Sequence, residues 1–304
     1  MLPDASVTVE MPGPYWLPGT RGVIGAQGPL GPLVIEGSTV WRALDTRDGP
    51  ATLRLSPAGP AVTAEAWGPG AGTAIAQAPE LAGANDVAAA DIVARHHVLA
   101  EVIRRRPRVR MVQTGTVWPH LPPTILAQKV QTDAAGRSWN GMVRRWGRRP
   151  PGPAPPRLRL VPEPATMAEI GYHELHPFGV ERKRAEIIRR AARRADRFER
   201  TMGDPPEEAR RVLESVPGIG PWTSAIVTQQ SHGDPDAVIV GDYHVPHLVA
   251  WALAGEARAT DERMLELLEP YAGQRARVQL LLKTSGLTPP KYGPRLEMVD
   301  IRGR

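Results

Sequence analysis

The chain has 304 residues, with 38 Lys and Arg against 32 Asp and Glu, and it contains no cysteine. This length is enough for two or three lobes with their own apolar cores. The absence of cysteine excludes disulfides, thiolate zinc sites and iron–sulfur clusters. The chain shows no secretory leader and no run of 18 apolar residues, so we expect a cytoplasmic protein that makes no membrane contact.

Positive charge is concentrated in the middle third of the chain. Residues 101–200 hold 22 Lys and Arg against 9 Asp and Glu, whereas residues 1–100 hold 5 against 9 and residues 201–304 hold 11 against 14. A local excess of this size is typical of a protein that binds a phosphate backbone. Taken alone, it is explained equally well by an Arg-rich composition from a GC-rich genome.

Residues 1–85 predict an antiparallel sheet. Short apolar runs alternate with turn signals such as Asp48-Gly49-Pro50 and Gly68-Pro69-Gly70. The predicted strands cover residues 33–35, 39–43, 51–55 and 61–66. Tyr15 and Trp16 are aromatic candidates for a ligand pocket in this lobe, although core packing explains them better.

The chain from residue 86 onward predicts helices. Apolar residues at helical spacing indicate helices over residues 91–104, 134–146, 179–200, 261–268 and 273–283. The proline-rich segment 148–156 is a linker or an extended loop. We therefore expect an α+β fold, with an antiparallel sheet lobe at 1–85 and a mainly α-helical, two-lobed domain at 86–304 whose tail covers 287–304.

The most informative stretch runs from Val212 to Leu253. An apolar-periodic helix ends at Pro217-Gly218-Ile219-Gly220, and a second helix begins at Pro221. The two glycines allow positive φ and close backbone approach, so this hairpin at 216–222 turns free N–H groups outward beside the positive end of a helix. Such a surface fits a phosphate anion.

An aspartate, Asp242, follows 22 residues after Gly220. Each feature has a plain alternative, because Pro-Gly-x-Gly also connects ordinary helices and an Asp before a helix is usually an N-cap. Together, the hairpin and Asp242-Tyr243 resemble the helix-hairpin-helix (HhH-GPD) DNA glycosylase superfamily, and within it the bacterial 3-methyladenine DNA glycosylase II type. The resemblance covers roughly residues 115–285 and includes Ile-Leu-x-Gln at 125–128 and Val-Pro-x-Pro at 161–164.

The resemblance implies roles for individual residues. Asp242 is the implied catalytic residue, and Trp222, Tyr243 and Gln274 are the implied base-pocket residues. The implied DNA contacts are Gln128, Lys129, Gly218, Gly220 and Thr223, with Lys129 standing where the family places an apolar wedge. Core packing of Trp222 and Tyr243, and a surface position for Gln274, remain alternatives.

Two further expectations follow from the resemblance. Trp222 stands where bifunctional members carry an amine-bearing lysine, and the other candidates, Lys129 and Lys283, are not at that position, so no AP lyase activity is expected. The hairpin carbonyls of Val216, Gly218 and Ile219 are a possible site for a structural monovalent cation. No catalytic metal is expected, although Asp242, His244 and His247 have a spacing that a metal search would find.

The sequence thus predicts a monofunctional DNA glycosylase of base excision repair that hydrolyses the N-glycosidic bond of alkylated purines. Its partner would be double-stranded DNA containing damaged bases, and we expect a nucleoid-associated monomer. Two alternatives stay open: a non-catalytic HhH DNA-binding protein, and a glycosylase for another lesion class.

Overall fold

The N-terminal part of the molecule is an antiparallel sheet, as predicted. The computed structural model describes residues 1–21, 30–105 and 109–290. Within these ranges, five strands pair in the order β1-β5-β4-β3-β2, and every neighbouring pair is antiparallel. The strands are β1 (Ala5–Glu10), β2 (Leu33–Glu36), β3 (Thr39–Thr46), β4 (Gly49–Ala58) and β5 (Ala61–Trp67).

The strand predictions are confirmed except at the edge of the sheet. The structure contains the four predicted strands and extends β3 and β4 beyond their predicted ends. The edge strand β1 was not predicted, and among its apolar residues Val9 is buried while Val7 is exposed. A strand that buries so little apolar surface has almost no alternation from which it can be recognised.

Both faces of the sheet are covered. Helices α1 (Ala71–Ala76) and α2 (Ala78–Ala82) pack on one face, against residues such as Leu53 and Val62. On the other face, Leu158 and Leu160 pack against Trp41 and Trp67. The proline-rich segment that precedes them is therefore an extended loop packed on the sheet, and the hydroxyl of Thr52 donates a hydrogen bond to the carbonyl of Pro151.

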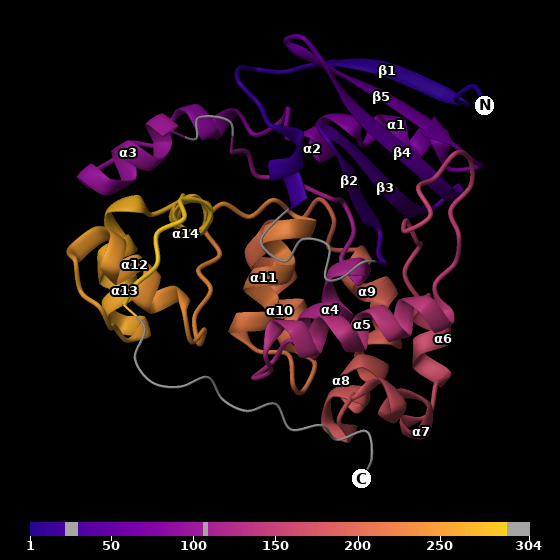
Figure 1. The fold of residues 1–304 in the computed structure, drawn as a ribbon. Coiled ribbons are helices and arrows are strands. Elements are labelled where there is room, and N and C mark those ends of the chain that lie inside the picture. The colour runs from indigo at the N-terminus through magenta and orange to yellow at the C-terminus, as the bar shows by residue number, and fades with distance from the viewer. Residues whose placement is uncertain (22–29, 106–108, 291–304) are drawn as a thin grey trace.

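The rest of the described chain is helical, which confirms the predicted α+β fold (Figure 1). The helices are α3 (His97–Arg105), α4 (Leu121–Leu126), α5 (Thr132–Trp146), α6 (Pro164–Glu169), α7 (Tyr172–Leu175), α8 (Arg182–Ala192), α9 (Ala195–Glu199), α10 (Pro206–Glu214), α11 (Pro221–Ser231), α12 (Val245–Ala254), α13 (Asp261–Leu268) and α14 (Arg275–Thr284). No helix of the described residues is long and apolar enough to span a membrane.

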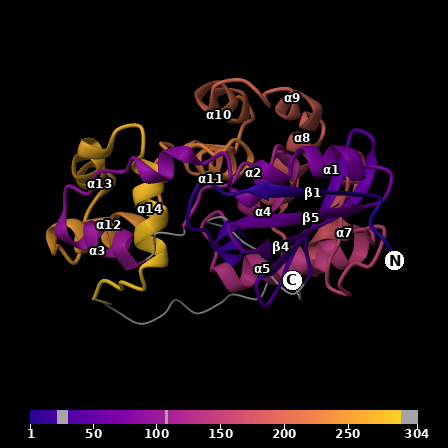
Figure 2. The ribbon, with the colours of Figure 1, turned by 90° about the horizontal axis from the view of Figure 1, so that it is seen from above.

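Helix α11 lies between two apolar cores. Helices α4 to α10 surround one core, which includes Val227 of α11. Helices α3, α12, α13 and α14 surround the other, which includes Ala225 and Ile226. Figures 1 and 2 both place α12, α13 and α14 on one side of α11 and helices α4, α5 and α8 on the other. The helical part therefore has two lobes that share α11.

Two helix predictions were wrong in their extent. The predicted helix over residues 91–104 begins only at His97, because the hydroxyl of Tyr271 accepts the backbone N–H of Arg95 and pairs with Nδ1 of His96. The predicted helix over 179–200 is broken between α8 and α9. The break lets both short helices bury their apolar side chains in one core.

An ion pair joins the end of the sheet lobe to α14. Asp86 accepts hydrogen bonds from the guanidinium of Arg277 and, at 2.7 Å, from the backbone N–H of Met111. The two charged side chains are only 9% and 3% exposed. This contact crosses the predicted boundary at residue 85, and the division of the chain there stays a prediction. The predicted tail lies mostly in residues 291–304, outside the described residues.

Candidate active site

The predicted hairpin is present between α10 and α11. Gly218 has a φ of +100°, and a Cβ at this position would lie 2.5 Å from Cδ1 of Ile187 on α8. Gly220 has a φ of −116°, and a Cβ there would meet no protein atom within 4 Å. The sequence allows positive φ at both glycines, and the structure has it only at Gly218, where both conformation and close packing exclude a side chain.

This difference predicts unequal effects of two matched variants. We expect Gly218→Ala to lower the free energy of unfolding by about 2–4 kcal/mol, because it adds backbone strain and a clash with Ile187. Gly220→Ala should lower it by at most about 1 kcal/mol, the cost of alanine at a helix N-cap. Urea denaturation of the two variants measures this difference, and equal losses would contradict the hairpin geometry.

The end of α4 braces the hairpin through Gln128. The side-chain amide of Gln128 donates to the carbonyl of Gly218 at 2.9 Å and to the hydroxyl of Thr223 at 3.0 Å. Arg184 donates in turn to the backbone carbonyl of Gln128 at 2.6 Å. Thr223 is buried. Gln128 and Thr223, both predicted to contact DNA, are thus brought together, and their polar side-chain atoms bond to the hairpin and to each other.

Lys129 has an unusual backbone conformation next to this brace. Its φ is +52°, and among the described residues it is the one non-glycine residue with positive φ. Its side chain is exposed. Residues other than glycine rarely adopt this region, and they do so most often at functional sites. Lys129 thus has an uncommon backbone conformation, and its place at the DNA gap stays a prediction.

Asp242 lies directly before α12, half-buried. One carboxylate oxygen accepts the backbone N–H groups of His244 at 2.8 Å and Val245 at 2.9 Å. The other accepts the indole N–H of Trp222 at 3.0 Å. Because Trp222 belongs to the first turn of α11, this bond places the carboxylate beside the start of the hairpin's second helix.

The surroundings of Asp242 keep its carboxylate ionised. Burial alone raises its pKa, but the hydrogen bonds from Trp222, His244 and Val245 and the positive charge of Lys283 outweigh burial, so the pKa falls below its usual value. A carboxylate with a lowered pKa carries a full negative charge at neutral pH. It is therefore able to stabilise a positive charge that develops next to it.

Tyr243 is the exposed aromatic side chain of the site, with 68% of its surface accessible. Its ring makes edge contacts with His244 and His247, at centroid distances of 4.9 and 5.7 Å. Trp222 is half-buried and packs against the second core while its N–H points to Asp242. Core packing, the alternative role for both residues, therefore applies to part of the Trp222 ring. It does not apply to Tyr243, which is exposed.

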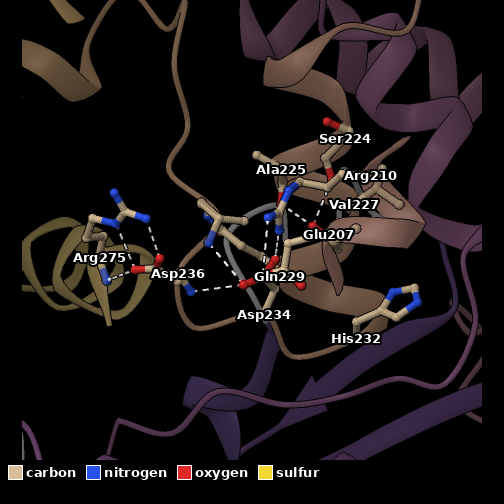
Figure 3. A network of polar contacts seen from close by, with 12 residues as sticks. Glu207, Arg210, Ser224, Ala225, Val227, Gln229, His232, Asp234, Asp236 and Arg275 are labelled. Atoms are coloured by element: carbon tan, nitrogen blue, oxygen red, sulfur yellow. Dashed lines mark hydrogen bonds and ion pairs between the residues drawn. The ribbon is translucent and has the colours of Figure 1, made fainter. Parts of the chain in front are cut away.

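The loop between α11 and Asp242 is fixed at several points (Figure 3). Asp234 forms an ion pair with Arg210 of α10, and its other oxygen accepts the backbone N–H groups of Asp236 and Ala237 at 2.9 and 3.0 Å. Asp236 forms an ion pair with Arg275 of α14. The loop is thus bonded to both helical lobes just before it delivers Asp242.

Lys283, in the last turn of α14, was not expected near the site. Its charge lowers the pKa of Asp242, and burial in turn lowers the pKa of Lys283 itself to about 8 although Asp242 opposes that shift. The sequence offered no local signal for this contact, because 41 residues separate the two side chains. Only the packing of α14 against α12 brings them together.

Gln274 lies at the opposite end of α14, about 13 Å from Lys283 along the helix axis. Its side-chain oxygen accepts from Nε of Arg277 at 2.6 Å. The side chain of Gln274 therefore bonds within its own helix, and its place in a base pocket stays a prediction. Ile226, one turn after Trp222, is buried in the second core.

The structure offers few candidates for metal ligands. In the described ranges, no group of three or more His, Cys, Asp or Glu side chains is arranged to hold a metal ion. Of the hairpin carbonyls, that of Val216 accepts the N–H of Ile219 at 2.9 Å, and that of Gly218 accepts from Gln128. Each carbonyl oxygen has two lone pairs, so one hydrogen bond leaves room for a cation. The monovalent cation at the hairpin stays a prediction.

Solved structures with this fold include several DNA glycosylases. A 3-methyladenine DNA glycosylase from Archaeoglobus fulgidus superposes with a TM-score of 0.76 at 18% identity, covering 92% of this chain and 98% of that one. An 8-oxoguanine glycosylase/lyase from Clostridium acetobutylicum, bound to double-stranded DNA, superposes with a TM-score of 0.65 at 12% identity, covering 84% of this chain and 87% of that one. A 3-methyladenine DNA glycosylase from Schizosaccharomyces pombe, bound to abasic DNA, superposes with a TM-score of 0.55 at 16% identity, covering 67% of this chain and 99% of that one. At these identities the likeness shows a shared fold.

The family follows from the sequence match. No curated protein sequence matches the chain. The profile of the HhH-GPD superfamily base excision DNA repair proteins matches residues 123–272, a range that contains the hairpin, Trp222 and Asp242. The chain therefore belongs to the HhH-GPD superfamily of base excision DNA repair proteins.

Proposed function

We propose that the protein is a monofunctional DNA glycosylase that hydrolyses the N-glycosidic bond of alkylated purines in duplex DNA. The hydrogen bond from Trp222 to Asp242 carries this proposal, because it joins the hairpin and an ionised carboxylate in one site. The hairpin would hold the DNA backbone while the carboxylate acts on the sugar of an extruded nucleotide. The lesion class rests on the resemblance to 3-methyladenine glycosylases and on the aromatic side chains beside Asp242.

Asp242 has the properties that this reaction requires. As the base departs, positive charge develops on the sugar ring, and an ionised carboxylate close to C1′ stabilises it. The same carboxylate can orient a water molecule and accept its proton. Two backbone N–H groups and an indole N–H fix its position, so little reorganisation is needed as the charge develops.

The aromatic residues and the basic third of the chain fit the substrate. The exposed ring of Tyr243 offers a face on which an extruded purine can stack, a contact worth on the order of 0.5–2 kcal/mol when the ring is cationic. Lys129, Gly218 and Gly220 would contact the DNA backbone near the gap left by that purine. Water rather than an amine would release the base, because position 222 carries an indole.

The test is base release from a randomly methylated duplex, scored by strand breaks before and after alkali. We expect breaks that require alkali, because hydrolysis leaves an abasic site uncut. Breaks before alkali would contradict the monofunctional mechanism. DNA binding without release from methylated, deaminated or oxidised duplexes would favour the non-catalytic alternative. Release from deaminated or oxidised duplexes, but not from methylated ones, would favour another lesion class.

DNA binding should depend steeply on salt. The 22 Lys and Arg of residues 101–200 include exposed side chains on α8 and α9, and each phosphate contact they make would release a counterion. We expect the logarithm of the association constant to fall linearly with the logarithm of salt concentration, with a slope steeper than about −3. Fluorescence anisotropy with an undamaged duplex measures the slope, and a flat response would count against the charge run as a DNA surface.

A further inference from the structure

The carboxylate of Asp242 has one hydrogen-bonding position left open. An ionised carboxylate has about four lone-pair sites, divided equally between its two oxygens. Oδ1 uses both of its sites, because it accepts the backbone N–H groups of His244 and Val245 at 2.8 and 2.9 Å. Oδ2 accepts the indole N–H of Trp222 at 3.0 Å. Within residues 1–21, 30–105 and 109–290 no other donor bonds to this carboxylate, so one site of Oδ2 remains for a ligand.

The two oxygens of Asp242 therefore have different roles. Oδ1 ties the side chain to the start of α12 and has no lone pair left for a reacting group. A water molecule or a sugar has to approach Oδ2. Because the indole N–H of Trp222 occupies one site of that oxygen, the position of the indole decides the direction in which the other site points.

The indole of Trp222 is itself held in place. Trp222 is the second residue of α11 and follows the hairpin directly. Its ring packs against the apolar core formed by α3, α12, α13 and α14. The next residue, Thr223, donates its N–H to the carbonyl of Gly220 at 2.9 Å, and its hydroxyl accepts from Gln128 at 3.0 Å. The donor is thus fixed before any ligand arrives, so little reorganisation is needed during a reaction at Oδ2.

We propose that Trp222 is a positioning residue that holds Oδ2 of Asp242 as the reacting oxygen of the site. The inference rests on the proposed function and names the reacting atom within it. In the hydrolytic step the oxygen of a water molecule bonds to C1′, and the electron pair of the C1′–N bond leaves with the base. Oδ2 accepts the proton that the water loses. In this role Trp222 acts through the carboxylate and not through contact with the base.

The base-pocket role that the resemblance implies for Trp222 makes a different prediction. An aromatic wall of the pocket contacts the base, and the attraction between a cation and a ring is strongest for indole. Its replacement by a smaller ring should then slow the release of cationic lesions more than that of neutral ones. A positioning residue acts on the carboxylate, and the carboxylate acts on the sugar, which all lesions share. Its replacement should therefore slow the release of every lesion by the same factor.

The experiment compares Trp222→Phe with Trp146→Phe. Phenylalanine keeps an aromatic ring for packing and stacking but has no N–H. Trp146, the last residue of α5, is half-buried against Phe178, and its indole N–H donates no hydrogen bond within the part of the chain that the structure describes. The same substitution there is the matched control. Thermal unfolding of both variants shows that they are folded.

Single-turnover release is measured from duplexes of one sequence that carry either 7-methylguanine, which is cationic, or 1,N6-ethenoadenine, which is neutral. For Trp222→Phe we expect release of each lesion that the wild type processes to fall by one common factor of at least about tenfold, the effect of removing a hydrogen bond to a charged group. The affinity for undamaged duplex should stay within about threefold of the wild type. Trp146→Phe should match the wild type in both measurements.

A second measurement needs no change at position 222. The chain has 8 tryptophans, and their indole N–H signals are compared in proton–nitrogen NMR spectra of the wild type and Asp242→Asn. In the variant an amide NH2 replaces Oδ2, so the signal of Trp222 should move toward the position of an indole without a charged acceptor. Trp222→Phe identifies this signal by its absence.

Three results would overturn the positioning role and leave the glycosylase proposal intact. These are a smaller fall in the release rate of Trp222→Phe, unequal factors for the two lesions or a loss of DNA affinity that accounts for the fall, and indole signals that Asp242→Asn leaves unchanged. Release of neither lesion by the wild type, together with no release from deaminated or oxidised duplexes, would overturn the proposed function, and the inference about Trp222 with it.

Discussion

Replacing Asp242 by asparagine should reduce single-turnover base release by about 10³-fold while leaving the protein folded. Asparagine keeps one oxygen, which can accept the N–H groups of His244 and Val245, while its amide NH2 replaces the oxygen that accepts the indole N–H of Trp222. It removes the negative charge that opposes the positive charge of the sugar. The loss should therefore appear in the rate constant for release and not in the affinity for duplex DNA.

The matched control for this variant is Asp133→Asn. Asp133 lies exposed in the first turn of α5, so Asp133→Asn makes the same chemical change at the start of another helix. It should release base at the wild-type rate. Single-turnover release and anisotropy titrations of both variants separate catalysis from binding, and Asp242→Asn activity within tenfold of wild type would exclude Asp242 as the catalytic carboxylate.

Replacing Arg277 by methionine should be the most destabilising single change at the junction of the sheet lobe with α14. The guanidinium pairs with Asp86, and both side chains are almost fully buried. Removing it leaves the buried carboxylate with the hydrogen bond from the N–H of Met111 and with the charge of Arg110 near it, but without its ion-pair partner. Breaking one side of a buried pair costs about 3–5 kcal/mol, so we expect a loss of that size in the free energy of unfolding.

The control is the same substitution at Arg263. This arginine pairs with Glu256 and Glu266, but its side chain is 41% exposed. Surface pairs of this kind contribute about 0–1 kcal/mol, so Arg263→Met should change stability little. Urea denaturation of the two variants gives the comparison. A loss below about 1 kcal/mol for Arg277→Met would mean that water or other groups compensate Asp86.

The parts of the site that the sequence predicted are those in which neighbouring residues determine the structure. Pro217, Gly218 and Pro221 set the hairpin because their backbone preferences act within a few residues. Asp242 was recognisable because it follows the hairpin at a fixed distance and precedes a helix. The sheet was predictable wherever one strand face is buried, and the prediction failed at the edge strand β1, which buries little.

The parts that the sequence could not predict depend on contacts between distant segments. Lys283 reaches Asp242 only because α14 packs on α12, and Arg277 pairs with Asp86 across 191 residues. The side chain of Gln128 was expected to face DNA, yet it bonds to the hairpin, which no local pattern reveals. The helix predicted over residues 91–104 begins later than predicted, because the backbone N–H of Arg95 donates to the hydroxyl of Tyr271 instead of to a helical carbonyl.

The burial of α11 has a consequence for how the molecule opens. All nine residues from Thr223 to Ser231 are buried, and their side chains contribute to both cores of the helical part. Neither lobe can lose its structure without exposing part of this helix to water. The two lobes should therefore unfold in a single cooperative step, and the backbone amides of α11 should exchange with deuterium only when the whole molecule opens. Strain between the two lobes would thus leave the segments around Asp242 in place until the whole protein unfolds.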